Sequence, residues 1–387
     1  MIPYGRQDIS QQDIDSVIGV LKSDFLTQGP VVPAFERALC DYTTAKRAVA
    51  CNSATSALHL ACRALELGPG DWLWTSPITF VASANCGLFC GASVDFVDID
   101  TESGNMSVVQ LEAKLETAKK TGQLPKILVP VHLGGNPSDM AGIRALQKKY
   151  GFRIIEDASH AIGARYKGQP IGNCRFSDIT VFSFHPVKII TTGEGGAALT
   201  NRAELAEKML LLRSHGITRN PDDMQRRNEG AWYYEQLDLG YNYRLTDLQA
   251  AIGLSQLQRL DEFIAARHQI ADEYSRLLED FPVKCPQPIP DGYSAFHLYV
   301  IRLMLTGMQN TRRAVFDNLR DLGIGVNVHY IPVHTQPFYR EKGFSEGDFP
   351  NAEKYYEEII SLPMFPALSL VEVRQVVASL QSALETT

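Results

Sequence analysis

The chain has 387 residues, of which 45% are hydrophobic and 21% are charged, and its formal net charge is −7 at pH 7. This length accommodates one large and one small domain, each with its own core. The net negative charge gives no overall basis for binding nucleic acid, but it does not exclude a local basic pocket for a phosphorylated small molecule.

The cysteines and the hydrophobic segments indicate the cellular compartment of the protein. The seven cysteines show no metal-type CxxC spacing, so we interpret them as reduced residues and expect no metal site. The N-terminus carries no hydrophobic signal segment, and no run of 18 apolar residues occurs. We therefore expect a cytoplasmic protein that does not associate with membranes.

Strands and helices alternate through the first half of the chain. A short amphipathic helix at 11–22 and an extended segment at 25–30 come first. The patterns then predict strands at 47–51, 72–74, 93–97, 126–131 and 153–155, and helices at 54–67, 82–90 and 141–150. This alternation is typical of an α/β fold, in which helices cover both faces of a mostly parallel sheet.

The pattern changes near Thr246. A long helical pattern over 247–278 is interpreted as the connection between two domains. Beyond it we predict strands at 297–303 and 325–329, and helices at 311–322 and 351–360. The sequence thus predicts a large domain over residues 1–250 and a smaller α+β C-terminal domain over residues 251–387.

An acid, a serine and a lysine are spaced as a pyridoxal phosphate (PLP) site requires. The predicted strand at 153–155 leads into Asp157, and Lys188 follows Ser183 and precedes a glycine-rich turn at 193–196. A lysine amine forms a Schiff base with the PLP aldehyde, and an acid pairs with the pyridinium nitrogen. Alone, Lys188 could be a surface residue and Asp157 a helix cap. Together they favour PLP as the cofactor.

Other residues are candidates for holding the phosphate and the ring of PLP. Small and hydroxyl residues at 52–56, including Thr55 and Ser56, lie between a predicted strand and a predicted helix. Backbone N–H groups and the helix dipole attract phosphate at such a junction. Ser183 is a further candidate for binding the phosphate or another part of the cofactor. Phe80 is a candidate for stacking on the ring, although aromatic residues are more often core.

The sequence leaves two interpretations open for each of two polar residues. His160 either contacts the phenolic oxygen of PLP or is a structural histidine, and Asn242 either binds phosphate or forms a turn. In the segment 329–334, two histidines flank a proline-fixed bend, where substrate contact or packing is favoured over zinc binding. The sequence has no GxGxxG after a strand, no P-loop and no HExxH, which disfavours NAD binding and P-loop chemistry.

With these motifs assembled, the chain resembles the nucleotide-sugar aminotransferases of PLP fold type I. The resemblance extends over essentially the whole length. It rests on Gly29-Pro30, Asn52-Ser53-Ala54-Thr55, Glu156-Asp157, residues 183–188, Gly193-Glu194-Gly195-Gly196, residues 240–247 and residues 329–332. It implies a seven-stranded, mostly parallel sheet between helices, and PLP-dependent transamination with Lys188 and Asp157 as the catalytic residues.

The resemblance also implies roles that the patterns leave open. It puts Phe80 on the PLP ring, His160 beside the ring oxygen, and Asn242 at the cofactor phosphate of the neighbouring subunit in a homodimer with shared active sites. It further implies a sugar-nucleotide site lined by Tyr4, Leu26, Thr27, Ser56, Ser183, His185, His329 and Tyr330.

Within the family, residues 2–7, 184–188 and 191–194 most resemble one branch. That branch moves an amino group from L-glutamate, which leaves as 2-oxoglutarate, to C4 of a UDP-linked 4-keto-6-deoxy-N-acetylhexosamine on the path to pseudaminic acid. The alternatives are another 4-keto or 3-keto nucleotide sugar, or a non-catalytic regulator with the same fold. Lys188 disfavours the dehydratase branch, which has histidine at this position.

Overall fold

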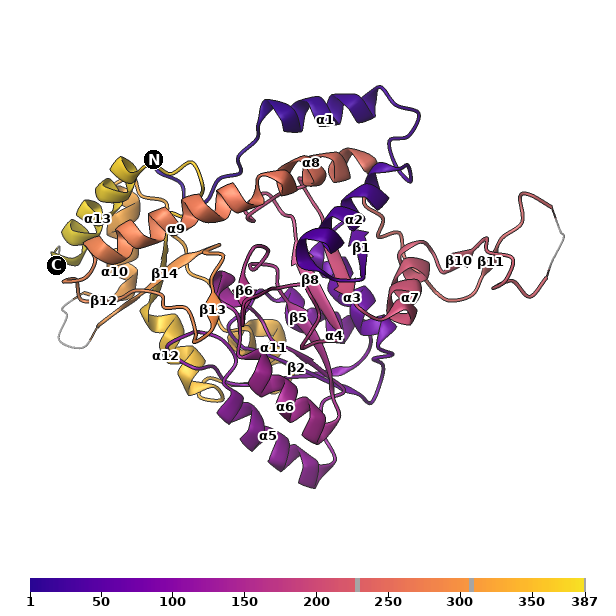
Figure 1. Cartoon of the computed structure of the whole chain (residues 1–387). Coiled ribbons are helices and arrows are strands. Elements are labelled where there is room, and N and C mark those ends of the chain that lie inside the picture. Colours follow the sequence, from indigo (N-terminus) through magenta and orange to yellow (C-terminus); the bar gives the residue numbers. More distant parts are fainter. Residues whose placement is uncertain (227–229, 306–309, 386–387) are drawn as a thin grey trace.

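The computed structural model describes residues 1–226, 230–305 and 310–385. Its centre is a seven-stranded sheet with the order β1-β9-β8-β5-β4-β2-β3 (Figure 1). In chain order the strands are β1 (Arg47–Cys51), β2 (Trp72–Thr75), β3 (Ser93–Phe96), β4 (Ile127–Val129), β5 (Arg153–Asp157), β8 (Ile179–Ser183) and β9 (Gly196–Thr200). Strand β9 runs antiparallel to both neighbours, and the other neighbouring pairs are parallel. The predicted mostly parallel seven-stranded sheet is confirmed.

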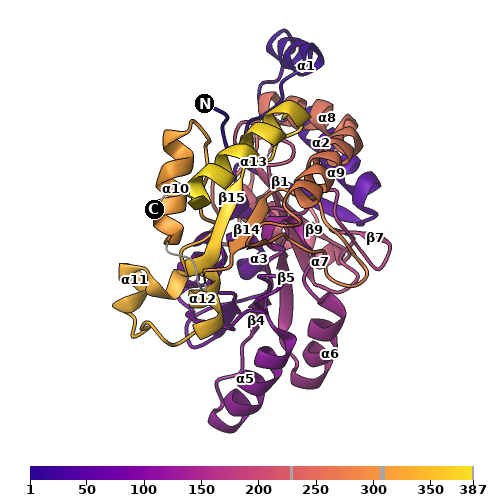
Figure 2. The same cartoon turned by 90° about the vertical axis from the view of Figure 1, so that its left-hand side faces the viewer.

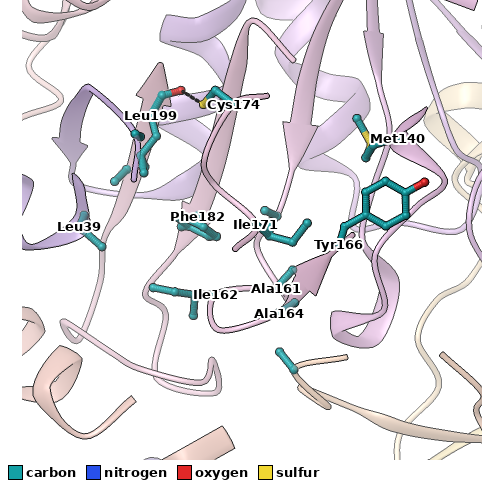
Figure 3. Packing of buried hydrophobic residues seen from close by; sticks show 14 of the residues in the cluster. Leu39, Met140, Ala161, Ile162, Ala164, Tyr166, Ile171, Cys174, Phe182 and Leu199 are labelled. Carbon is teal, nitrogen blue, oxygen red and sulfur yellow. Dashed lines mark hydrogen bonds between the residues drawn. The ribbon is translucent and has the colours of Figure 1, made fainter. Parts of the chain in front are cut away.

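Both faces of the sheet are buried under helices. Successive strand residues point to opposite faces, so neighbouring residues enter different cores. Ile154 and Phe182 belong to one core and Ile155 and Val181 to the other. The first core contains residues of α2 (Val31–Thr43), α5 (Val108–Thr121) and α6 (Met140–Tyr150), and Figure 3 shows Leu39 and Phe182 within it. The second contains residues of α3 (Ala54–Ala64), α4 (Ala82–Phe89) and α7 (Ala203–Arg213).

Side-chain caps fix where several helices begin. Ser10 and Asp13 form a capping box at the start of α1 (Gln11–Leu21), and Thr246 and Gln249 form another at the start of α8 (Asp247–Gln258). Ser53 caps α3 by accepting a hydrogen bond from the Ser56 backbone N–H.

A third core lies in the C-terminal part of the chain (Figure 2). A small antiparallel sheet of β12 (Val283–Lys284), β14 (Tyr299–Leu303) and β15 (Ile359–Leu362) packs with α9 (Leu260–Leu277), α10 (Arg312–Asp321) and α13 (Leu370–Glu385). Ile2 pairs with Ile324, so the N-terminal residues join this core. We take this unit to be the predicted smaller domain, and its boundary at residue 251 stays a prediction.

The remaining elements are short. Strands β6 (Arg165–Tyr166), β7 (Gln169–Pro170) and β13 (Gly292–Tyr293) form a small sheet, and β10 (Ile217–Thr218) pairs with β11 (Glu235–Gln236) in a hairpin that projects from the body (Figure 1). Helices α11 (Pro337–Arg340) and α12 (Pro350–Glu358) precede β15. No helix in the described ranges is long and apolar enough to cross a bilayer.

Two sequence predictions for the C-terminal half are wrong. The helix at 247–278 is two helices, α8 and α9, because the Arg259 N–H bonds to the Gln256 carbonyl and tightens the turn there. The segment 325–329 is not a strand, and Asn327 alone of these residues forms a bridge, to Ser361. The Asn327 side chain accepts the Val328 N–H, which removes that donor from a ladder.

Candidate active site

A cavity of about 650 Å³ opens where the parallel strands end. The segments that follow β1, β2, β5 and β8 meet at this edge, as the carboxyl ends of parallel strands do in α/β proteins. The predicted residues that line the cavity are Tyr4, Thr55, Ser56, Phe80, Asp157, His160, Ser183, His185, Lys188, His329 and Tyr330. Segments from both ends of the chain thus converge on a single site.

Lys188 lies in the turn between β8 and β9. The Lys188 N–H donates to the His185 carbonyl, and the Thr192 N–H donates to the Phe184 carbonyl, so a compact loop holds the lysine over the cavity. Burial lowers the pKa of Lys188 to about 8, although the Asp157 carboxylate acts in the opposite direction. A larger share of the amine is therefore unprotonated and nucleophilic than in an exposed lysine.

Asp157 is the last residue of β5 and is buried in the cavity wall. Its Oδ1 accepts the Ser159 N–H at 3.1 Å, and its Oδ2 accepts the Ser83 hydroxyl at 2.6 Å. The preceding residue, Glu156, faces the other side of the sheet, where His132 contacts it at 2.9 Å. Asp157 therefore presents a fixed carboxylate to the cavity.

The N-terminus of α3 forms part of the cavity wall. The Ser56 hydroxyl donates to Asn52 Oδ1 at 2.7 Å and lies 3.0 Å from the Ser53 hydroxyl. A Cβ at Gly196 would collide with the backbone of Ala54, so glycine allows β9 to pass close to the helix start. Residues 53–56 line the cavity, so the positive end of the α3 dipole faces it and favours an anion there.

Histidines and tyrosines line the opposite wall. The Gly134 N–H donates to Nδ1 of His160 at 3.2 Å, and Nε2 of His160 lies 3.1 Å from the Tyr330 hydroxyl. Burial lowers the pKa of His160 well below its usual value, with Lys188 adding to the effect. Neutral His160 therefore carries its proton on Nε2 and donates it to Tyr330, which leaves the Tyr330 hydroxyl proton free to point elsewhere.

His329 is also kept neutral. Its Nδ1 lies 2.8 Å from the Ser361 hydroxyl, and its ring centroid is 5.7 Å from that of Tyr4. Burial, with a smaller contribution from the charge of Lys188, lowers the pKa of His329 to about 4. Phe80, by contrast, is 58% exposed at the cavity rim, where an aromatic face is available for stacking.

Three predicted residues lie outside this cavity lining. Leu26 and Thr27 are exposed and pair with the start of α8, where the Asp247 N–H donates to the Leu26 carbonyl and Thr27 bridges Thr246. Asn242 is exposed beside the cavity entrance, where its carbonyl is 3.5 Å from the Asn52 side chain. Within a single chain, these three residues do not line the cavity.

Other lining residues were not predicted. They include Thr79, Ser159, Glu194 and His297, and Ser83 contacts Asp157 from behind the wall. The rings of His297 and His160 are 4.4 Å apart between centroids, and burial lowers the pKa of His297 well below its usual value. In the sequence His297 begins a predicted strand and Ser83 falls in a helix, so neither has a local chemical signal.

The residues present fit PLP. The site offers a lysine with a lowered pKa for the aldehyde, a buried carboxylate for the ring nitrogen and a helix N-terminus for the phosphate. In the described part of the chain, no group of three or more His, Cys, Asp or Glu residues could hold a metal ion. The site and the doubly covered sheet define a PLP-dependent transferase of fold type I.

Comparisons with known proteins identify the family. The model of the DegT/DnrJ/EryC1/StrS aminotransferase family matches residues 7–381, and the chain belongs to this family. It is a PLP-dependent sugar aminotransferase. The UDP-4-amino-4,6-dideoxy-N-acetyl-beta-L-altrosamine transaminase of Campylobacter jejuni (serotype O:23/36, strain 81-176) is 41% identical over 386 residues, which cover 100% of this chain and 98% of the relative.

Two solved structures are similar over nearly their whole length. Helicobacter pylori PseC, an aminotransferase involved in the biosynthesis of pseudoaminic acid, matches with a TM-score of 0.91 and 33% identity, covering 100% of both chains. The PLP-form of the putative sugar aminotransferase Spr1654 from Streptococcus pneumoniae matches with a TM-score of 0.88 and 30% identity, covering 99% of this chain and 98% of the other.

Proposed function

We propose that this protein transfers the amino group of L-glutamate to C4 of a UDP-linked 4-keto-6-deoxy-N-acetylhexosamine, forming UDP-4-amino-4,6-dideoxy-N-acetyl-β-L-altrosamine in pseudaminic acid biosynthesis. The observation that carries the transferase chemistry is the single cavity shared by Lys188, Asp157 and the N-terminus of α3. The choice of sugar is supported by the 41% identity to the Campylobacter transaminase.

When bound, PLP withdraws electrons from the carbon that gains or loses the amino group. In this proposal the Nζ of Lys188 moves a proton between Cα of the amino donor and C4′ of the cofactor, and the same atom serves in reverse when the keto sugar accepts the amine. The lowered pKa of Lys188 suits this task, because the amine both accepts and releases protons near neutral pH.

The other cavity residues bind and orient. We assign Asp157 to holding the proton on the ring nitrogen. Ser183, Thr55, Ser56 and the α3 N-terminus bind the phosphate, and Phe80 stacks on the ring. His160 contacts the ring oxygen through Nε2, the atom that now faces Tyr330. None of these roles requires a metal ion.

The sugar-nucleotide site is proposed to include Tyr4, His185, His329 and Tyr330, with contributions from Ser56 and Ser183. Leu26, Thr27 and Asn242 lie outside the cavity lining of their own chain. We propose that they act in a homodimer, in which Asn242 serves the cofactor phosphate of the neighbouring subunit. An isologous dimer makes this exchange reciprocal, so that two identical shared sites form.

A panel of keto-sugar nucleotides tests the substrate. The purified holoenzyme is incubated with L-glutamate and each UDP-linked or dTDP-linked 3-keto or 4-keto sugar, and 2-oxoglutarate and the amino sugar are quantified. The proposal expects the highest kcat/KM with the UDP-linked 4-keto-6-deoxy-N-acetylhexosamine. A higher value with another keto sugar would reassign the substrate, and absence of turnover with every sugar would favour the non-catalytic regulator.

A further inference from the structure

Two buried hydroxyls form a chain of hydrogen bonds that ends on the Asp157 carboxylate. Ser83, in the first turn of α4, donates to Oδ2 of Asp157 at 2.6 Å, and its oxygen lies 2.7 Å from the Thr79 hydroxyl. The side chain of Ser83 is 0% exposed and that of Thr79 is 2% exposed. Both hydroxyls are therefore shielded from water, and their hydrogen bonds are made within the protein.

The direction of these hydrogen bonds follows from counting protons. A carboxylate only accepts, and serine has a single hydroxyl proton, so Ser83 is the donor to Asp157. The contact of Ser83 with the Phe80 carbonyl is longer, at 3.3 Å. Since the Ser83 proton is used on Asp157, Thr79 is the donor in the contact between the two hydroxyls. The relay thus runs from Thr79 through Ser83 to Asp157.

The relay fixes the orientation of the carboxylate. Oδ2 is held by Ser83, while Oδ1 is held by the Ser159 N–H at 3.1 Å. With one donor on each oxygen from different chain segments, rotation about χ2 of Asp157 would break at least one hydrogen bond to a charged group. The same short segment, 79–83, also presents Phe80 at the cavity rim, so the proposed stacking residue and one support of the carboxylate lie close together in the chain.

We propose that Ser83, supported by Thr79, is a positioning residue that aims the Asp157 carboxylate at the ring nitrogen of the bound cofactor. The inference rests on the proposed role of Asp157. A purely structural hydroxyl exists next to it for comparison: Ser177 donates to the Oε1 of Glu156, the neighbouring residue of β5, on the opposite face of the sheet. Both serines are buried and both donate to a buried carboxylate, but Ser177 does not line the cavity.

An analogue of PLP whose ring nitrogen is replaced by C–H separates positioning from general support. The full-length protein is freed of cofactor, and the Kd values of PLP and of this deaza analogue are measured for each variant. Wild type is expected to prefer PLP. Ser83→Ala should reduce that preference about tenfold, the scale of a misdirected hydrogen bond to a charged group. Thr79→Val should reduce it less, because Ser83 keeps its proton.

Two further variants complete the experiment: Ser177→Ala is the control, and Asp157→Asn shows the largest expected loss of preference. Ser177→Ala should leave the preference ratio unchanged even if both Kd values rise, whereas Asp157→Asn should lose most of the preference. If Ser83→Ala keeps the wild-type ratio while Asp157→Asn loses it, the positioning role of Ser83 is overturned and the proposed role of Asp157 stands. If Asp157→Asn itself keeps the ratio, both are overturned.

Should Ser83→Ala fail to fold, Thr79→Val decides, since it retains side-chain shape and removes the first donor of the relay. A reduced preference ratio in Thr79→Val supports the inference, and an unchanged ratio overturns it.

Discussion

Replacing Lys188 by methionine should stabilise the cofactor-free protein at neutral pH while abolishing covalent attachment of PLP. Burial lowers the pKa of Lys188 from 10.5 to about 8. Because each pKa unit between folded and unfolded chains corresponds to about 1.4 kcal/mol, the protonated amine destabilises the folded apoprotein by about 3 kcal/mol below pH 8. Methionine keeps a similar length and removes the buried charge.

The pH dependence distinguishes this cause from better packing. Between pH 8 and pH 10.5 the unfolded chain binds a proton at this position that the folded chain has released. The free energy of unfolding of wild type therefore rises with pH in that window. The advantage of Lys188→Met should be about 3 kcal/mol at pH 7 and fall to about 1 kcal/mol at pH 10.

Urea unfolding of the two apoproteins at both pH values measures the difference. Lys354→Met, at an exposed lysine in α12, is the matched control and should change stability equally little at both pH values. An advantage of Lys188→Met that is the same at pH 7 and pH 10 would refute the argument from the buried charge. A loss of stability at pH 7 would refute it as well.

Two further predictions concern Asp157 and the dimer. Asp157→Asn should still bind PLP but lose activity by roughly hundredfold or more, because an amide does not hold the pyridinium proton as a carboxylate does. Steady-state kinetics of the holoenzyme measure this loss. Near-normal rates would show that Asp157 is only a capping residue. Lys188→Ala and Asn242→Ala homodimers should each be impaired. Mixing and re-equilibrating the two at limiting PLP should restore activity toward half of wild type per dimer. In a mixed dimer, one active site carries both defects and the other carries neither. A mixture no more active than the mean of its parents would show that Asn242 does not serve the neighbouring subunit.

The alternation of strands and helices could be read from the sequence because it depends on local periodicity. The pattern over residues 47–155 predicts the five sheet strands of that region and the helices α3, α4 and α6, and α1 and α6 lie within one residue of their predicted ranges. Strands β8 and β9 and helices α2, α5, α7 and α13 were not predicted. Strand β9 consists mostly of glycine and alanine, which are depleted in strands, so its sequence carries only a weak strand pattern.

The central chemistry was also visible in sequence. Lys188, Asp157 and the small residues at 52–56 stand in motifs short enough to be recognised along the chain, and all of them line a single cavity. The split between α8 and α9 at Arg259 had no such signal, because the apolar pattern continues through the turn in which the Arg259 N–H bonds to the Gln256 carbonyl.

The sequence by itself determined the residue types that can do PLP chemistry and the fold class that carries them, because both follow from local spacing and hydrophobic period. Tertiary structure decided which side chains meet. The hydrogen bond from Ser83 to Asp157, the tautomer of His160 and the entry of His297 into the site join residues that are distant in sequence. The lowered pKa of Lys188 likewise arises from burial by the assembled cavity wall, a property that no segment of the chain has before it folds.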